Sequence, residues 1–92
     1  MMAVHPGRVL RREMAARGLS ANALALALRT PSGRVTDILN GKRGVSPETA
    51  MRLARYFGNS ARFWLNLQTA YELALAEREL GEKIAAEVSP AA

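Results

Sequence analysis

Apolar residues recur along this chain every three or four positions, which is the spacing of one face of an α-helix. The clearest stripe consists of Ala50, Leu53, Ala54 and Phe57, at relative positions i, i+3, i+4 and i+7. β-Branched residues are few, and they never alternate with polar residues over four or more positions, so no strand is predicted. The pattern therefore predicts an all-α protein.

Hydroxyl-bearing residues, prolines and glycines divide this apolar pattern into segments. Ser20, Ser46 and Ser60 can accept hydrogen bonds from the free N–H groups of a first helical turn, and Thr30 is expected to do the same with Pro31 following it. Glycine suits the left-handed position that ends a helix. We predict five helices, over about residues 8–17, 21–28, 31–39, 47–57 and 61–87.

The fifth predicted helix is the longest, and its two ends differ in character. It opens with Phe63 and Trp64, whose helical spacing to Leu67 favours packing in a core over a platform that stacks on bases. No helix breaker precedes Gly81, and residues 88–92 are expected to form a frayed tail. We expect a core over about residues 5–75 and a helical extension over about 72–87.

An apolar stripe continues along this extension, beyond the point where a five-helix domain closes. It consists of Leu73, Ala76, Leu80 and Ile84. A purely intramolecular role is the alternative, but an exposed stripe favours contact with a partner helix. We therefore expect Leu73, Leu80 and Ile84 to form the seam of a homodimer.

Length and composition limit the kinds of protein that this chain can be. Its 92 residues suffice for one domain with a single core, and 49% hydrophobic residues exclude global disorder. With no Cys and one His there is no disulfide framework and no His-based metal cluster, so no metal, no cofactor and no enzymatic activity are expected. The longest purely apolar stretch, residues 23–28, is too short for a bilayer, and residues 1–8 lack the apolar run typical of a signal peptide. A cytoplasmic protein is expected.

Positive charge is concentrated in the first half of the chain. Residues 1–43 carry eight Arg and Lys against two acidic residues, whereas residues 44–92 carry five against six. A basic half can dock on a polyanion such as nucleic acid, although charge that merely solubilises the chain is an equal alternative.

The connection between the second and third predicted helices is the most informative feature. A turn of about three residues, Arg29-Thr30-Pro31, joins two helices of about nine residues and indicates a helix-turn-helix. The second helix of such a pair can enter the major groove of DNA and present its outer side chains to base edges. A solvated helical corner is the alternative for a helix pair taken alone.

Several motifs then resemble known proteins. Ala23-Leu24-Ala25, the turn, Val35 and residues 38–42 resemble the phage-repressor (lambda repressor-like, Cro/repressor or XRE) helix-turn-helix family. Closer still, the segments at residues 5–10, 38–46, 49–58 and 63–68 resemble its HigA branch, antitoxins of toxin–antitoxin operons. Residues 5–10 read His-Pro-Gly-Arg-Val-Leu, and residues 63–68 read Phe-Trp-Leu-Asn-Leu-Gln. The resemblance covers about residues 4–75 and implies a compact five-helix domain.

The resemblance implies which residues touch DNA. The expected base-reading residues on the third helix are Ser32, Gly33, Arg34, Thr36 and Asp37. The expected phosphate contacts are Ser20, Asn22, Lys42 and Arg43.

Two positions depart from the family pattern, and a third, Gly33, affects the third helix itself. Ala21 stands where a Gln is usual, so Ser20 and Asn22 are the substitutes for its phosphate contact. Arg29 replaces the usual turn glycine, and a left-handed conformation there costs about 1 kcal/mol. Gly33 weakens the third helix by a similar amount but lets its backbone approach DNA closely.

The resemblance also implies partners: a palindromic operator, a second copy of the chain, and a HigB-like toxin, a RelE-like ribonuclease that cleaves mRNA. We expect His5, Arg8, Arg11 and Arg12, at the start of the first helix, to form the toxin face. A structural role for His5 is the favoured reading of that residue taken alone, because no nucleophile or carboxylate is near it in sequence. The alternatives to an antitoxin are a stand-alone XRE repressor without a toxin and a scaffold module without nucleic acid.

Overall fold

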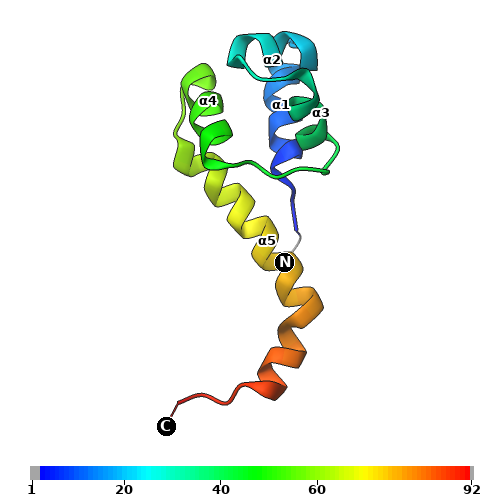
Figure 1. Ribbon diagram of the computed structural model, residues 1–92, viewed down its shortest axis with the longest axis vertical. Coiled ribbons are helices and arrows are strands. Elements are labelled where there is room, and N and C mark those ends of the chain that lie inside the picture. The colour runs from blue at the N-terminus through cyan, green and yellow to red at the C-terminus, as the bar shows by residue number, and fades with distance from the viewer. Residues whose placement is uncertain (1–2, 92) are drawn as a thin grey trace.

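The computed structural model describes residues 3–91 and is all-α over them, as predicted. The helices are α1 (Pro6–Arg17), α2 (Ala21–Leu28), α3 (Ser32–Leu39), α4 (Pro47–Phe57) and α5 (Ala61–Glu87). The first four helices and the start of α5 form a helical body, and α5 then runs on alone (Figure 1). Its projecting end makes the molecule 53 Å long and only 22 Å wide.

Serine side chains begin three of the helices as predicted. The hydroxyls of Ser20, Ser46 and Ser60 each accept a hydrogen bond from the N–H three residues later. α1 begins at Pro6, two residues before the predicted start, because His5 caps it: its Nδ1 accepts from the N–H of Gly7 at 2.9 Å. Proline is tolerated at a first helical position because no hydrogen bond within the helix needs its N–H.

The prediction that Thr30 caps α3 is wrong. The N-cap is Pro31, which offers no side-chain hydrogen bond, and α3 begins at Ser32. The Thr30 backbone N–H donates to Ala25 to close α2, and its hydroxyl is buried without a hydrogen-bond partner. The turn thus ties Thr30 to the preceding helix.

The core consists of the apolar stripes that the sequence predicts. Its largest fully buried side chains are Trp64, Leu10, Leu24, Ile38, Leu53 and Val35. Trp64 lies in the core as expected and donates from Nε1 to the side-chain oxygen of Asn59 at 2.9 Å. Phe63 stays 40% exposed, and Leu39 is half-buried at the edge of the core.

The N-terminal turn of α1 packs directly on the C-terminal end of α3. A Cβ at Gly7 would collide with the backbone carbonyl oxygen of Ile38, so the close approach requires glycine. Van der Waals contact between backbones leaves little freedom for sliding. This contact with α1 therefore fixes the position of α3.

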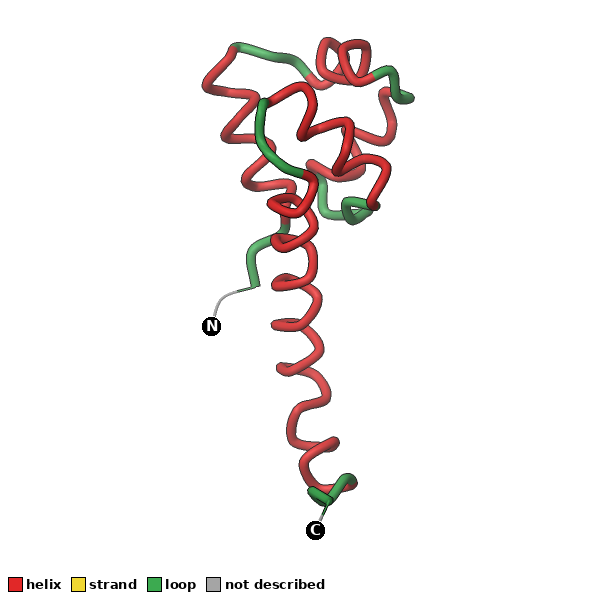
Figure 2. The backbone as a smooth tube through the Cα atoms, turned by 90° about the vertical axis from the view of Figure 1, so that its left-hand side faces the viewer, coloured by secondary structure: helices red, strands yellow, loops and turns green. Residues whose placement is uncertain are grey.

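α5 continues through Gly81 without interruption and extends beyond the other helices (Figure 2). We call residues 76–87 the arm; all of them are exposed except the half-buried Gly81. Residues 88–91 of the predicted tail have no regular secondary structure, and Ala92 lies outside the described residues. Within residues 3–91, no helix combines the length and apolar character needed to cross a bilayer.

Candidate nucleic-acid interface

The turn between α2 and α3 has the left-handed residue expected at Arg29. Its φ is 59° and its ψ is 45°, and no other non-glycine residue of the described chain has a positive φ. The N–H groups of Arg29 and Thr30 donate back to the carbonyls of Leu26 and Ala25, which closes α2. The chain then changes direction within three residues and starts α3 at Ser32.

The outer face of α3 carries short side chains. Ser32, Gly33 and Thr36 are exposed, whereas Val35 and Ile38 face the core. A Cβ at Gly33 would meet no atom within 4 Å, so this stretch of α3 opens onto free space. An unobstructed helix face is what entry into a major groove requires.

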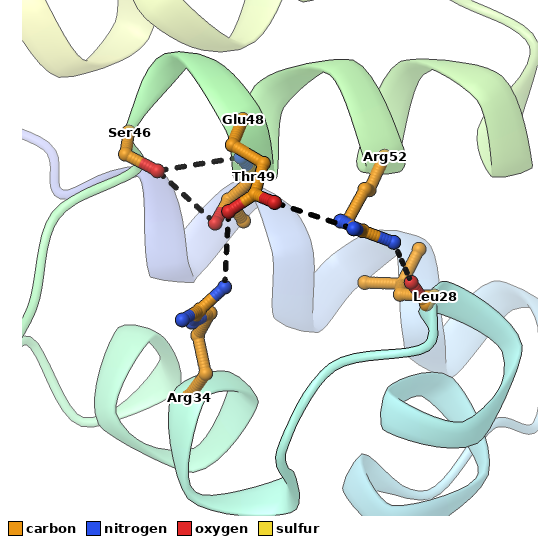
Figure 3. Close-up of polar contacts among 6 residues, drawn as sticks. All are labelled: Leu28, Arg34, Ser46, Glu48, Thr49 and Arg52. Carbon is orange, nitrogen blue, oxygen red and sulfur yellow. Dashed lines mark hydrogen bonds and ion pairs between the residues drawn. The ribbon is translucent and has the colours of Figure 1, made fainter.

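The remaining two predicted base readers are half-buried. The backbone carbonyl of Asp37 accepts from the N–H groups of Lys42 and Arg43, at 2.8 and 3.2 Å. Arg34 lies toward α4, where its Nη1 is 3.6 Å from a carboxylate oxygen of Glu48 (Figure 3).

Sequence reasoning missed Glu48 and its second partner, Arg52. The other carboxylate oxygen of Glu48 is 3.2 Å from Arg52, which also donates to the carbonyl of Leu28 at 2.9 Å. The i,i+4 spacing of Glu48 and Arg52 was the only signal in the sequence. Nothing local links either of them to Arg34, fourteen residues away from Glu48.

The loop after α3 presents Lys42 and Arg43 to solvent. Their backbones are tied to α3 through Asp37, and the loop is also held by α5: the side-chain oxygen of Gln68 accepts from the N–H of Val45 at 2.8 Å. Gln68 lies so close to Gly44 that a Cβ there would collide with its amide. The two basic side chains thus project from a loop that is anchored at both ends.

The other predicted phosphate contacts, Ser20 and Asn22, are exposed at the N-terminus of α2. The Ser20 oxygen accepts from the N–H of Ala23 at 3.1 Å, which leaves its hydroxyl proton free to donate to a phosphate. α2 packs against α3, so these residues stand on the element next to the helix that carries the predicted base readers.

The predicted toxin face lies on α1. Arg8, Arg11 and Arg12 are exposed and, with Ala15, line a depression of about 300 Å³. His5 is half-buried: it caps α1, and its ring packs edge-on against Tyr71 of α5 at 4.8 Å. Burial lowers the pKa of His5 below its usual value, and a hydrogen bond with the backbone of Arg43 opposes that shift. The structure gives His5 a structural role.

The apolar stripe of α5 is exposed. Leu73, Leu80 and Ile84 are 55%, 43% and 51% exposed. Among residues 3–91, no three side chains of the His, Asp or Glu type gather into a possible metal site. The glutamates of α5 are exposed on the helix surface.

The sequence of the helices that build this surface matches a known family. Residues 10–64 match the family described as helix-turn-helix. The chain belongs to the helix-turn-helix family. Virulence-associated protein I of Dichelobacter nodosus is 50% identical over 80 residues, which are 86% of this chain and 74% of that protein. Members of this family are not enzymes, which confirms the expectation of a non-enzymatic protein.

Solved structures narrow the resemblance to the HigA branch, as the sequence motifs predict. An addiction module antidote protein of the HigA family from Coxiella burnetii is 47% identical, with a TM-score of 0.95 over 99% of this chain and all of that one. Pseudomonas aeruginosa antitoxin HigA, solved with the higBA promoter, is 42% identical, with a TM-score of 0.96 over 99% of this chain and all of that one. The arm is therefore part of the shared fold.

Proposed function

We propose that the protein is a DNA-binding antitoxin that represses its own operon and neutralises a RelE-like, mRNA-cleaving toxin by direct contact. The observation that supports DNA binding best is the open face of α3 beside an anchored basic loop. The Pseudomonas antitoxin that shares this fold was solved with a promoter. Such a repressor works where its operator is, in the cytoplasm.

The DNA-facing surface consists of α3, the loop after it and the N-terminus of α2. Base reading falls to Ser32, Gly33, Arg34, Thr36 and Asp37, and phosphate contact to Ser20, Asn22, Lys42 and Arg43. Three of the first group, Ser32, Gly33 and Thr36, are exposed on α3, which supports their role in base reading. The second group supplies affinity that does not depend on sequence, because cations displace the counterions of DNA.

The exposed stripe of α5 supports a homodimer. An apolar stripe on a single solvated helix is removed from water when a second copy packs on it. Two copies of α3 must then stand about 34 Å apart, so the operator is a palindrome with half-site centres about ten base pairs apart or a multiple of that. Leu73, Leu80 and Ile84 form the seam.

A direct test measures binding to the DNA upstream of the protein's own gene by mobility shift, with salt varied. Arg43→Ala should lower the slope of log affinity against log salt by about one and leave sequence preference unchanged, because it removes one phosphate contact. Thr36→Ala should weaken binding by about 5- to 150-fold and relax preference at one position in each half-site. Wild-type affinity that is equal for upstream and scrambled duplexes would contradict the proposal.

The toxin is proposed to bind α1. Arg8, Arg11 and Arg12 form an exposed charged surface that the core does not use, and the structural role of His5 fixes the start of this helix. Copurification with the product of the neighbouring gene tests the partnership. Arg8→Glu with Arg12→Glu should reduce copurification of the toxin while operator binding persists.

A matched variant on α5 separates the two surfaces. Leu73→Asp with Leu80→Asp should give monomers in light scattering and lose operator affinity, while toxin binding persists. If the α5 variant instead loses the toxin and the α1 variant keeps it, the assignment of the two faces is reversed. A neighbouring gene product that never copurifies would leave a stand-alone repressor.

A further inference from the structure

Three charged side chains join the helix-turn-helix to the start of α4. Arg52 donates to the carbonyl of Leu28, the last residue of α2, and lies 3.2 Å from one carboxylate oxygen of Glu48. The other oxygen of Glu48 is 3.6 Å from Nη1 of Arg34 on α3 (Figure 3). The Glu48 carboxylate thus connects the end of α2, through Arg52, with Arg34 of α3.

Arg34 lies on the side of α3 and not on the face that points directly away from the core. At about 100° per residue, its Cα lies between those of Asp37 and the buried Ile38, on the side of α4. From this flank a long side chain can reach forward to DNA or back over α4. Its conformation therefore depends on a partner outside α3.

Glu48 is suited to be that partner, because its own position is held. It lies in the first turn of α4, where the helix dipole favours a negative charge. Arg52 holds it from the other side and is itself anchored on a backbone carbonyl. The Glu48 side chain is nevertheless 63% exposed, so the network sits at the surface and not in the core.

We propose that Glu48 is a positioning residue for sequence readout, a role that rests on the proposed DNA binding. Its carboxylate pairs with one guanidinium nitrogen of Arg34, so that the rest of the guanidinium faces a base. The guanidinium has five N–H donors, and the structure shows Glu48 as the side-chain partner of Nη1 alone. Guanine presents two acceptors in the major groove that suit bidentate contact by an arginine.

The same carboxylate acts against non-specific binding. A negative charge beside Arg34 repels phosphate and weakens the attraction of that arginine to any backbone. Removing the charge should therefore change the two affinities in opposite directions, so that their ratio falls: non-specific DNA binds more tightly, while the operator loses an organised contact. A merely structural role for Glu48 would lower both affinities together.

The test compares two duplexes in fluorescence anisotropy at one fixed salt concentration. The first is the segment of the protein's upstream DNA that footprinting protects, and the second is a scrambled duplex of equal length and composition. Glu48→Gln should lower the ratio of the two affinities by about 5- to 20-fold, within the range that one good bidentate contact provides. Affinity for the scrambled duplex should rise. Arg34→Ala should lower the ratio at least as far, and Arg34→Ala with Glu48→Gln no further than Arg34→Ala alone.

The matched control is Glu13→Gln. Glu13 is a glutamate that pairs with Arg17 within α1 at 3.3 Å and lies on a helix outside the recognition pair. Glu13→Gln removes the same charge as Glu48→Gln. Because Glu13 does not contact Arg34, this substitution should leave the affinity ratio unchanged. Circular dichroism checks that each variant is folded.

The outcomes separate the two claims. A wild-type protein that does not distinguish the duplexes overturns the proposed function itself. If the wild type discriminates but Glu48→Gln keeps its ratio, or the double variant loses the sum of both effects, the positioning role is wrong. An unchanged ratio for Arg34→Ala overturns it as well, because Arg34 would then read no base.

Discussion

Replacing Arg29 with glycine should stabilise the protein, although it removes a charged side chain from the surface. Arg29 ends α2 with a φ of 59° and a ψ of 45°, in the left-handed region that L residues with a Cβ avoid. α1 and α4 end in the same region, but with Gly18 and Gly58. Of these three helix ends, only the end of α2, in the turn of the helix-turn-helix, therefore carries backbone strain.

The magnitude follows from two opposing effects. A left-handed conformation costs a non-glycine residue about 1–2 kcal/mol, and Arg29→Gly removes this cost. Glycine gives the unfolded chain more freedom, which returns about 0.4–1 kcal/mol. Among the described residues, the side-chain hydrogen bonds and ion pairs of arginine come from Arg11, Arg17, Arg34 and Arg52 and not from Arg29, so little else is lost. The net gain is about 1 kcal/mol, or about 4–8 °C in Tm for a domain of this size.

Thermal unfolding followed by circular dichroism at 222 nm measures this gain, at one protein concentration because dimers gain stability with concentration. Arg29→Ala keeps the backbone strain while removing the side chain, so its Tm should stay close to the wild-type value. Gly18→Ala is the reverse change at a φ of 63°, where a Cβ would meet no atom, and should lower the stability. Equal gains from Arg29→Gly and Arg29→Ala would refute the backbone explanation.

The remaining predictions concern the anchored loop and the cap of α1. Gly44→Ala should displace the side-chain amide of Gln68, whose atoms would lie within 2.7 Å of the new Cβ. In a mobility shift this variant should weaken operator binding more than it lowers Tm. Burial lowers the folded-state pKa of His5, so the unfolded chain takes up a proton first as the pH falls below about 6.5. Stability that is present above pH 6.5 should therefore decline toward pH 5 in urea unfolding. His5→Asn, which keeps a capping oxygen without titrating, should show a smaller decline over that range.

The sequence by itself determined the features that depend on neighbours along the chain. The period of the apolar residues predicts the five helices, and each serine cap at positions 20, 46 and 60 acts within three residues. Trp64 is predicted in the core by its spacing alone, and Arg29 is predicted to be left-handed by its place in the turn. These features are local because a helix is built from contacts three and four residues apart.

Only the tertiary structure decided how these helices support one another. The contact of Gly7 with the backbone of Ile38, the hydrogen bond from Val45 to Gln68 and the ion pair of Arg34 with Glu48 join residues at least fourteen positions apart. No periodicity encodes such pairs, since they depend on the angles at which the helices pack. For the same reason the sequence places Arg34 on the reading helix but does not show that a carboxylate of α4 holds it.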